Sequence, residues 1–352
     1  MAINLAEAFS KKVAEAFKQE SLTDSATGKD YSFAGTRTVR VWSVDTVPLV
    51  DYTRSGANRY GTPVELGDTV QELTMRDEKA WTFTIDKGNQ ADQYNIKGAT
   101  RAARRETEQV VIPYVDKYRF KEWCSNAGLI SGLSAAPTKT TIVDAIFDAG
   151  AAMSDKLVPW SGRTLYIPNQ YFKLLALSDQ FVSVEALGKR SISKGEVGEI
   201  DNMVVKRVPA SYLPEGVYFM VKYKGSSVDP VKLQDVKIHQ DPPGIGGNLL
   251  EGRIYHDAFV LGAKANGIYV AAASGSVTAN PTVSDTSGTV TITKKGTCKY
   301  TTDGTDPRYS STAQVYSSTF SAEAGTVVKA VDVESGKFPS GVAEYTVKGA
   351  GG

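Results

Sequence analysis

The stretch that decides the fold runs Leu249-Leu-Glu-Gly-Arg-Ile-Tyr-His-Asp-Ala-Phe-Val-Leu-Gly-Ala-Lys-Ala-Asn-Gly-Ile-Tyr-Val270. It is rich in β-branched and aromatic residues, which favour strands. Gly252, Gly262 and Gly267 stand where a strand would bend or end. The stretch offers no nucleophile, base or metal-ligand cluster. It therefore indicates a protein whose residues determine shape rather than perform chemistry.

The bulk composition is that of an ordinary soluble globular protein. Of 352 residues, 41% are apolar and 22% are charged, enough for about two or three domains with a substantial core. Lys and Arg number 40 and Asp and Glu 39, so the net charge is +1. A dedicated nucleic-acid binder carries a basic excess that neutralises phosphates. Any contact with nucleic acid is therefore expected to be local or incidental.

The N-terminal sequence, which does not read as a signal peptide, and the cysteine usage both predict a cytoplasmic protein. The N-terminus reaches charged residues before an apolar stretch long enough for a signal peptide. No apolar run approaches the length of a membrane span. Cys124 and Cys298 lie far apart and form neither a metal-ligand spacing nor a disulfide framework. We expect both thiols to stay reduced.

The first hundred residues or so predict elements that are too small or too polar to stand alone. Residues 3–19 predict a short amphipathic helix, and residues 51–96 predict a long polar hairpin whose connection is 70–79. The helix has one apolar face, formed by Leu5, Phe9, Val13 and Phe17. Such a helix and such a hairpin are marginal unless something covers them. Each is covered either by its own domain or by a neighbouring copy.

The strongest predicted helix spans residues 97–126, and Gly128 follows it as a C-cap signal. Its apolar stripe consists of Val110, Val111, Tyr114, Val115 and Tyr118. At ~1.5 Å per residue it would extend roughly 45 Å. Pro113 is expected to kink it, because the proline ring removes one backbone hydrogen bond. Arg and Glu alternate in its first half, which predicts a solvated or subunit-facing surface rather than a phosphate site.

A body of mixed helices and strands follows. Residues 141–158 predict a helix whose apolar face ends at Leu157. Residues 163–168 predict a strand, followed by a helix with Asn169 as its N-cap. Further strands are predicted within 195–214, 217–223 and 231–239. This irregular order indicates an α+β body rather than repeated βαβ units.

The composition changes after Tyr269. Residues 271–276 read as a linker, and Ser, Thr, Gly and Val dominate from Asn280 onward. Short strands are predicted at 289–293, 298–302, 315–320, 326–333 and 344–347, a rhythm typical of a small β-sandwich. We interpret Asp303 and Asp306 as turn residues rather than a calcium site.

Motifs for catalysis were sought and none was found. His239 and His256 do not have the spacing of zinc ligands, and no G-x-S-x-G elbow occurs. Gly244-Ile-Gly-Gly247 follows two prolines and precedes a strand, which is the wrong context for a phosphate loop. We therefore predict that the chain is not an enzyme and holds no metal or cofactor.

Three segments, taken in order, carry a family resemblance: Arg163–Pro168, Gly195–Pro214 and Leu249–Val270. They resemble the A-domain strand and helix, the Gly-x-x-Gly loop-strand and the closing P-domain strand of HK97-fold major capsid proteins of tailed bacteriophages. The resemblance covers roughly residues 1–272. The tail, 299–307 followed by 327–331, is similar to the Ig-like module at the C-terminus of chitobiase-type hydrolases. Such modules recur on phage structural proteins as surface decorations.

The resemblance implies a domain organisation: an N-terminal arm (1–50), an E-loop (51–96), a P- and A-domain body (97–272) that includes the spine helix (97–126), a linker (273–279) and an Ig-like sandwich (280–352). It implies contacts between subunits through Phe9, Phe17, Arg54, Arg59, Glu65, Arg76, Asp77 and Trp81. It implies a spine-helix core of Val111, Tyr114, Val115 and Tyr118. The family has no catalytic residues to transfer.

The implied function is that of a major capsid protein. Its copies would form pentamers and hexamers of an icosahedral phage head around double-stranded DNA, with the Ig-like domain displayed outside. The implied partners are a scaffolding protein, a portal, DNA held without sequence specificity and, for the Ig-like domain, the host surface or glycans, but no membrane. The implied location is the virion, after assembly in the host bacterial cytoplasm.

Two alternatives stay open: an encapsulin-like compartment shell and a carbohydrate-binding surface module. The predicted linker also implies that residues 275–352 can be deleted without preventing assembly.

Overall fold

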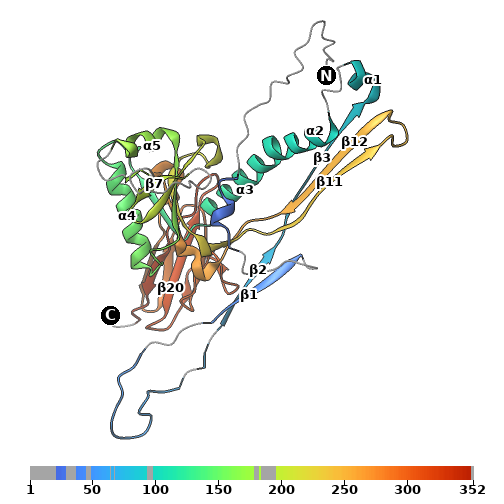
Figure 1. Ribbon diagram of the computed structural model, residues 1–352. Coiled ribbons are helices and arrows are strands. Elements are labelled where there is room, and N and C mark those ends of the chain that lie inside the picture. The colour runs from blue at the N-terminus through green and yellow to red at the C-terminus, as the bar shows by residue number, and fades with distance from the viewer. Residues whose placement is uncertain are drawn as a thin grey trace.

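The computed structural model describes residues 21–28, 37–44, 49–63, 65–66, 68–92, 98–177, 182–183 and 196–349. It is a mixed α+β structure, as predicted. A body, a long sheet beside a long helix, a projecting hairpin and a C-terminal β domain make up the molecule (Figure 1). The helix predicted at 3–19, with Phe9 and Phe17, lies outside the described residues.

A seven-stranded sheet forms the centre of the body, in the order β4-β14-β9-β5-β8-β7-β6. Its strands are β4 (Leu129–Leu133), β14 (Ile268–Ala273), β9 (Val217–Tyr223), β5 (Arg163–Pro168), β8 (Met203–Val208), β7 (Glu196–Ile200) and β6 (Val182–Ser183). Helices α4 (Ile142–Asp155) and α5 (Asn169–Ala176) pack on it. Strand β14 is a continuous apolar run because both of its faces are covered.

Three local predictions in the body need correction. Leu157 is 90% exposed, because it follows the end of α4 in a left-handed conformation (φ 58°). Asn169 is the first residue of α5, and Pro168 holds the N-cap position. Ala271 and Ala272 are fully buried in β14 and paired with β4 and β9, so they are not part of a linker.

The second sheet is long, antiparallel and three-stranded. It contains β11 (Val231–Gln240), β12 (Gly247–His256) and β3 (Asp77–Asp86), with β12 in the middle, and the short helix α1 (Lys87–Asp92) follows β3. Gly252 of β12 lies opposite Trp81 of β3. A Cβ atom at Gly252 would lie 2.1 Å from the indole, so the glycine makes room for that ring. Two further short strands, β10 (Ser227–Val228) and β13 (Phe259–Val260), pair beside the body.

The prediction of one hairpin over 51–96 is wrong. Strand β1 (Thr38–Val44) pairs with β2 (Asp68–Thr74), whereas β3 pairs with β12, about 170 residues away along the chain. Residues 70–79 are not a turn, because only Met75 and Arg76 separate β2 from β3. The polar strand β3 is stabilised by pairing with β12, a partner that local periodicity does not reveal.

The predicted spine helix is present as one helical run. It consists of α2 (Ala99–Glu106), a π-helical turn (Thr107–Val111) and α3 (Ile112–Ser125). The Ile112 N–H donates to Thr107 O, five residues back, immediately before Pro113. A π turn adds a residue to one turn and thereby rotates the stripe. Val110, predicted to be buried, is accordingly 51% exposed.

Residues 21–28 belong to the body although they fall within the predicted N-terminal arm. Leu22 and Ala26 are buried in the main core with Phe120 and Trp123. The buried Asp116 of α3 accepts hydrogen bonds from Ser21 Oγ (2.8 Å) and Leu22 N (2.9 Å), and also from the Thr23 hydroxyl. A buried carboxylate satisfied this way fixes the segment to the spine helix.

The C-terminal domain consists of two facing antiparallel sheets. One contains β15 (Thr282–Thr286), β16 (Thr289–Thr293) and β19 (Phe320–Ser321); the other contains β18 (Gln314–Val315), β17 (Thr297–Thr301), β20 (Val327–Val333) and β21 (Ala343–Thr346). Apolar side chains alternate inward, so that Val290 and Ile292 meet Cys298 and Val328 in the core. The sandwich was predicted, but β15 was missed, and the strand expected at 315–320 is two short strands.

Candidate assembly surface

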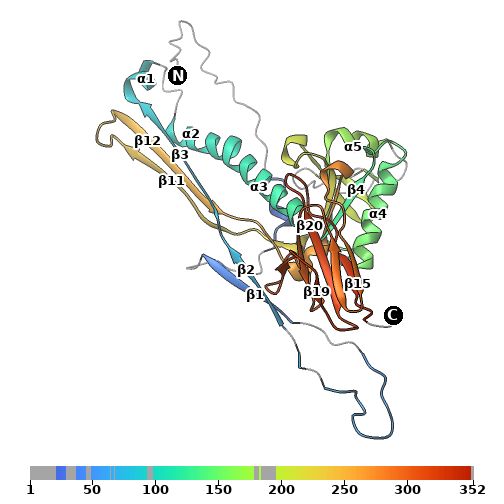
Figure 2. The same cartoon turned by 180° about the vertical axis from the view of Figure 1, so that it is seen from behind.

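The β1–β2 hairpin and its tip, residues 49–66, project away from the body (Figures 1 and 2). Exposed large apolar side chains gather on them: Trp42, Val44, Leu49, Val50, Tyr52, Tyr60 and Leu66. Leu49 is fully exposed and Tyr60 is 85% exposed. Clustered exposed apolar groups mark a surface where a protein, a membrane or a ligand can bind. We call residues 38–74 the projecting hairpin.

The tip of the projecting hairpin is held by its own contacts. Thr53 N donates to Arg59 O (3.1 Å), and Gly61 N donates to Asn58 O (2.9 Å). The rings of Tyr52 and Tyr60 meet edge to face, with centroids 5.0 Å apart. Gly61 adopts φ 83°, a conformation that favours glycine. The tip therefore presents its apolar side chains from a closed loop.

The root of the projecting hairpin is fixed to the body. Gln71 Nε2 donates to Val260 O (2.9 Å), and Gly262 N donates to Gln71 Oε1 (2.8 Å). Leu73 and Met75 are buried against Phe259 and Leu261. A rigid root and an uncovered tip make the hairpin an arm that can reach another molecule.

Two aspartates organise the junction between β2 and β3. Asp257 accepts Arg76 N (2.8 Å) and the Tyr118 hydroxyl (2.9 Å), while Asp77 accepts the Tyr114 hydroxyl (3.0 Å). Burial and the neighbouring carboxylates raise the pKa of both tyrosines, so they act as donors. The junction thus ties the hairpin to α3.

His256 is buried beside these groups. Its Nε2 lies 3.0 Å from Asp77 Oδ2, but the two atoms are not aligned as a hydrogen bond. Burial lowers the pKa of the imidazole in spite of Asp77, and the ring packs edge to face against Tyr114 and Tyr118. It contributes packing to the junction.

The predicted contact residues separate into three groups. Arg54, Arg59 and Glu65 lie exposed on the tip, and the Arg76 side chain is 63% exposed at the root. Asp77 and Trp81 are engaged within the chain: Asp77 with Tyr114, and Trp81 stacked on Phe83 at 5.4 Å. Phe9 and Phe17 lie outside the described residues.

The predicted spine-helix residues occupy one face of that helix. Val111 and Val115 are buried against Ile254, whereas Tyr114 and Tyr118 are half-buried in the junction. The residues that sequence reasoning missed are the apolar ones on the hairpin, above all Trp42, Leu49 and Tyr60. For Leu49 and Tyr60 the signal was large apolar side chains in a polar stretch with Gly56 and Gly61, without the alternation of a core strand; Trp42 stands in an alternating strand, where it points away from the buried side.

A buried lysine near the strap of residues 21–28 has a testable consequence. Lys222 Nζ donates to Ala26 O and lies 4.4 Å from the centre of the Trp123 ring. Burial lowers the pKa of Lys222 to about 8, although Asp229 opposes the shift. Between pH 8 and the ordinary lysine pKa near 10.5, the unfolded chain binds more protons than the folded one. Stability should therefore rise with pH through this window.

We predict that Lys222→Met reduces this rise. The measurement is the urea midpoint of wild type and variant between pH 7 and 9; both proteins carry the same cysteines and tyrosines, so the difference between their slopes reports Lys222. Equal slopes in the two proteins would contradict the assignment of the proton to Lys222.

The described residues contain no helix long and apolar enough to cross a membrane. The described part of the chain also has no group of three or more His, Cys, Asp or Glu residues able to hold a metal ion.

Solved structures with a similar fold come from phages. A Mycobacterium phage Che8 structure aligns with a TM-score of 0.59 at 17% identity over 76% of this chain and 96% of its own. The mature capsid of bacteriophage PhiM1 aligns at 0.58 and 12%, over 76% of this chain and 91% of its own. The capsid of cyanophage P-SCSP1u aligns at 0.55 and 15%, over 76% and 92%. The protein has the HK97-like fold of phage capsid proteins.

The C-terminal domain is similar to a different family from the one that the body resembles. Residues 289–347 match the family model described as Fn3 associated. The HK97-like body thus carries an Fn3-associated, Ig-like domain after β14, as the resemblance of the tail implied. No curated protein matches the sequence of the chain.

Proposed function

We propose that the chain is a major capsid protein whose copies assemble into a closed icosahedral shell around phage DNA. The observation that carries the proposal is the projecting hairpin, whose apolar tip is closed by its own contacts and left uncovered by the described part of the chain. The HK97-like fold supports the same conclusion, because phage capsids share it. In this proposal the hairpin, Thr38–Thr74, is the E-loop that lies on a neighbouring subunit.

The energetics favour a repeated contact between copies. A two-stranded hairpin is marginal by itself, and a neighbour that covers it supplies the missing burial. Subunits interlaced in this way bury on the order of 2,000 Å² or more. Many such contacts in one shell reinforce one another.

The charge of the chain suits a container for DNA. The net charge of +1 leaves the DNA without a strongly basic wall that would hinder packing and release. We propose that the DNA contact is non-specific, that scaffold and portal proteins direct assembly in the bacterial cytoplasm, and that the Ig-like domain faces outward from the virion. The chain would then be a structural protein and not an enzyme.

Electron microscopy of the protein expressed alone, with sedimentation velocity, tests the proposal. Closed shells or regular capsomers are expected. Uniform monomers that persist after scaffold and portal are supplied would contradict the capsid function. Shells that copurify with protein cargo instead of DNA would favour the encapsulin-like alternative. Retention of the full chain on a glycan column, without assembly, would favour the carbohydrate-binding alternative.

A further inference from the structure

The turn that contains Asp303 and Asp306 is followed by Arg308 and Tyr309, whose side chains contact the body. Asp303 Oδ1 accepts Thr305 N (3.0 Å), and Asp306 accepts both the backbone N–H (3.0 Å) and the guanidinium (2.6 Å) of Arg308. The Arg308 side chain is only 9% exposed. A carboxylate that holds a guanidinium on two sides fixes its direction. The turn therefore aims Arg308 out of the sandwich and into the body.

Arg308 and its neighbour bind the carbonyl groups of the residues that directly follow the spine helix. Arg308 Nη1 donates to Ala127 O (2.8 Å) and Gly128 O (3.1 Å), and the Tyr309 hydroxyl donates to Asn126 O. Carbonyl groups at a helix C-terminus lack partners within the helix and attract a cation. The C-terminal domain thus binds the carbonyl of the C-cap residue of α3, Asn126, and the carbonyls of the two residues that follow it.

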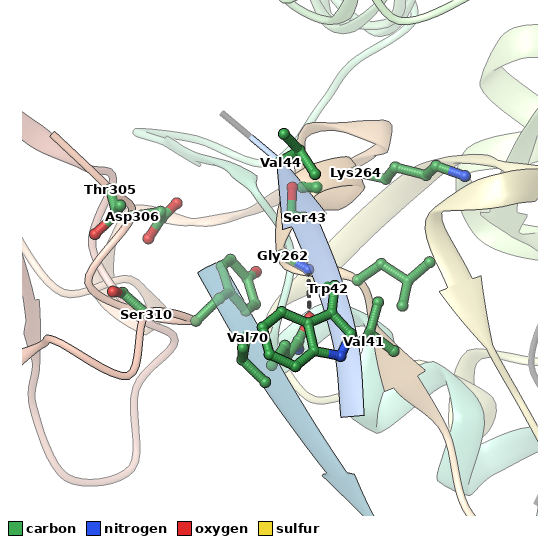
Figure 3. A pocket seen from close by; sticks show the side chains of 14 residues that line it. Val41, Trp42, Ser43, Val44, Val70, Gly262, Lys264, Thr305, Asp306 and Ser310 are labelled. Carbon is green, nitrogen blue, oxygen red and sulfur yellow. Dashed lines mark hydrogen bonds between the residues drawn. The ribbon is translucent and has the colours of Figure 1, made fainter. Parts of the chain in front are cut away.

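Tyr309 also reaches the root of the projecting hairpin. A Cβ atom at Gly262 would lie 2.6 Å from Tyr309 Cβ, so the glycine lets the ring approach its backbone. The N–H of the same glycine binds Gln71 of β2. Figure 3 shows the groove of about 450 Å³ beside this contact, with Trp42 and Val70 on the hairpin side and Thr305, Asp306 and Ser310 on the other.

The predicted linker at 273–279 is packed rather than free. Ala273 is the last residue of β14, and Thr278 is 1% exposed. Thr278 N donates to Phe338 O (2.9 Å), and Phe338 N donates to Ser276 O (2.8 Å). Phe338 and Tyr309 both pack against the main core of the body. The domain is therefore held to the body at two places, the chain connection and the Arg308 turn.

We propose that the Ig-like domain braces its own subunit: through Arg308 and Tyr309 it holds the end of the spine helix and the root of the projecting hairpin in one fixed relation. The domain then has a mechanical function inside the chain, separate from any display on a surface. The inference goes beyond the capsid proposal and does not require that the protein assembles. It also changes the expectation for a deletion of residues 275–352, which would remove the contacts that hold residues 126–128 after α3.

The test is hydrogen exchange of the full chain, unassembled, read by mass spectrometry on peptides that span 122–130 and 260–264. The variants are Tyr309→Phe, which removes one hydroxyl, and Arg308→Met with Tyr309→Phe. The matched control is Tyr316→Phe, because the Tyr316 oxygen accepts Ile292 N inside the sandwich. Both brace variants should exchange faster in the two peptides, by about tenfold in the double variant. The control should leave these peptides unchanged.

A thermal scan adds a second readout. Wild type is expected to unfold in one transition, whereas the double variant should show a separate transition of the Ig-like domain and a body transition lower by about 2–6 °C. Unchanged exchange in both peptides together with an unchanged melting curve would overturn the proposal. Exchange and melting are both read on unassembled protein, so this result would overturn the brace alone, whereas the capsid function depends on whether the protein forms shells.

Discussion

Replacing Val115 with aspartate is expected to prevent the chain from folding. Val115 is 8% exposed and packs with Val111 against Ile254, where the spine helix meets the long sheet. A carboxylate in this apolar contact has no partner, and burying it costs several kcal/mol. A loss of about that size removes much of the roughly 5–15 kcal/mol that keeps a domain folded. Circular dichroism and the yield of soluble protein measure the result.

The same helix provides the control. Val110 is 51% exposed, so Val110→Asp introduces the same charge into the same helix at a position that water reaches. We expect that variant to fold with wild-type ellipticity. Soluble, folded protein from Val115→Asp would mean that the buried face of the spine helix is assigned to the wrong residues. Loss of folding in both variants would mean that an aspartate disrupts this part of the helix whether or not the position is buried.

The comparison of these two valines shows what local periodicity can and cannot reveal. The sequence predicts the spine helix and β16 from an apolar period, and β5 and β9 from short apolar runs that end at turn residues. It places Val110 in the buried stripe because an α-helical period continues through Pro113. The π turn at Thr107–Val111 changes that period, and the spacing of apolar residues in the sequence does not predict the turn.

Long-range pairing is the second limit. Strand β3 reads as half of a local hairpin because its side chains alternate, yet its partner is β12, with Asp77 opposite His256. The segment 271–276 reads as a linker because it is small and Ser-rich, yet Ala271 and Ala272 are small because β14 is covered on both faces. In both cases the deciding contact comes from residues distant in the chain.

The same limit applies to the residues that were expected at contacts between subunits. Arg54, Arg59 and Glu65 were expected at a contact between subunits; they lie exposed on the tip, and that contact stays a prediction. Asp77 and Trp81 were expected at a subunit contact, but their partners, Tyr114 and Phe83, lie within the chain. A charged or aromatic side chain does not reveal from sequence whether its partner belongs to its own chain or to another.

Replacing Leu49 and Tyr60 with aspartate is expected to abolish shell assembly and leave the subunit folded. Both side chains are exposed on the tip, so the change removes no buried contact within the described chain. Covering one such side chain at a contact contributes about 1.5–3 kcal/mol, which corresponds to roughly tenfold to a hundredfold in affinity. The contact repeats in every subunit of a shell, so the effect on assembly is larger than on one pair.

Sedimentation velocity and electron microscopy measure assembly, while circular dichroism measures the fold. The matched control is Val315→Asp, an exposed apolar residue of the Ig-like domain that the proposal places outside the subunit contacts. The control should form shells at the wild-type concentration, and the hairpin variant should remain unassembled at concentrations at least about tenfold higher. Wild-type shells from the hairpin variant would show that the exposed apolar tip is not what joins the subunits, because a charged tip cannot be buried against a neighbour without the same desolvation cost that prevents Val115→Asp from folding.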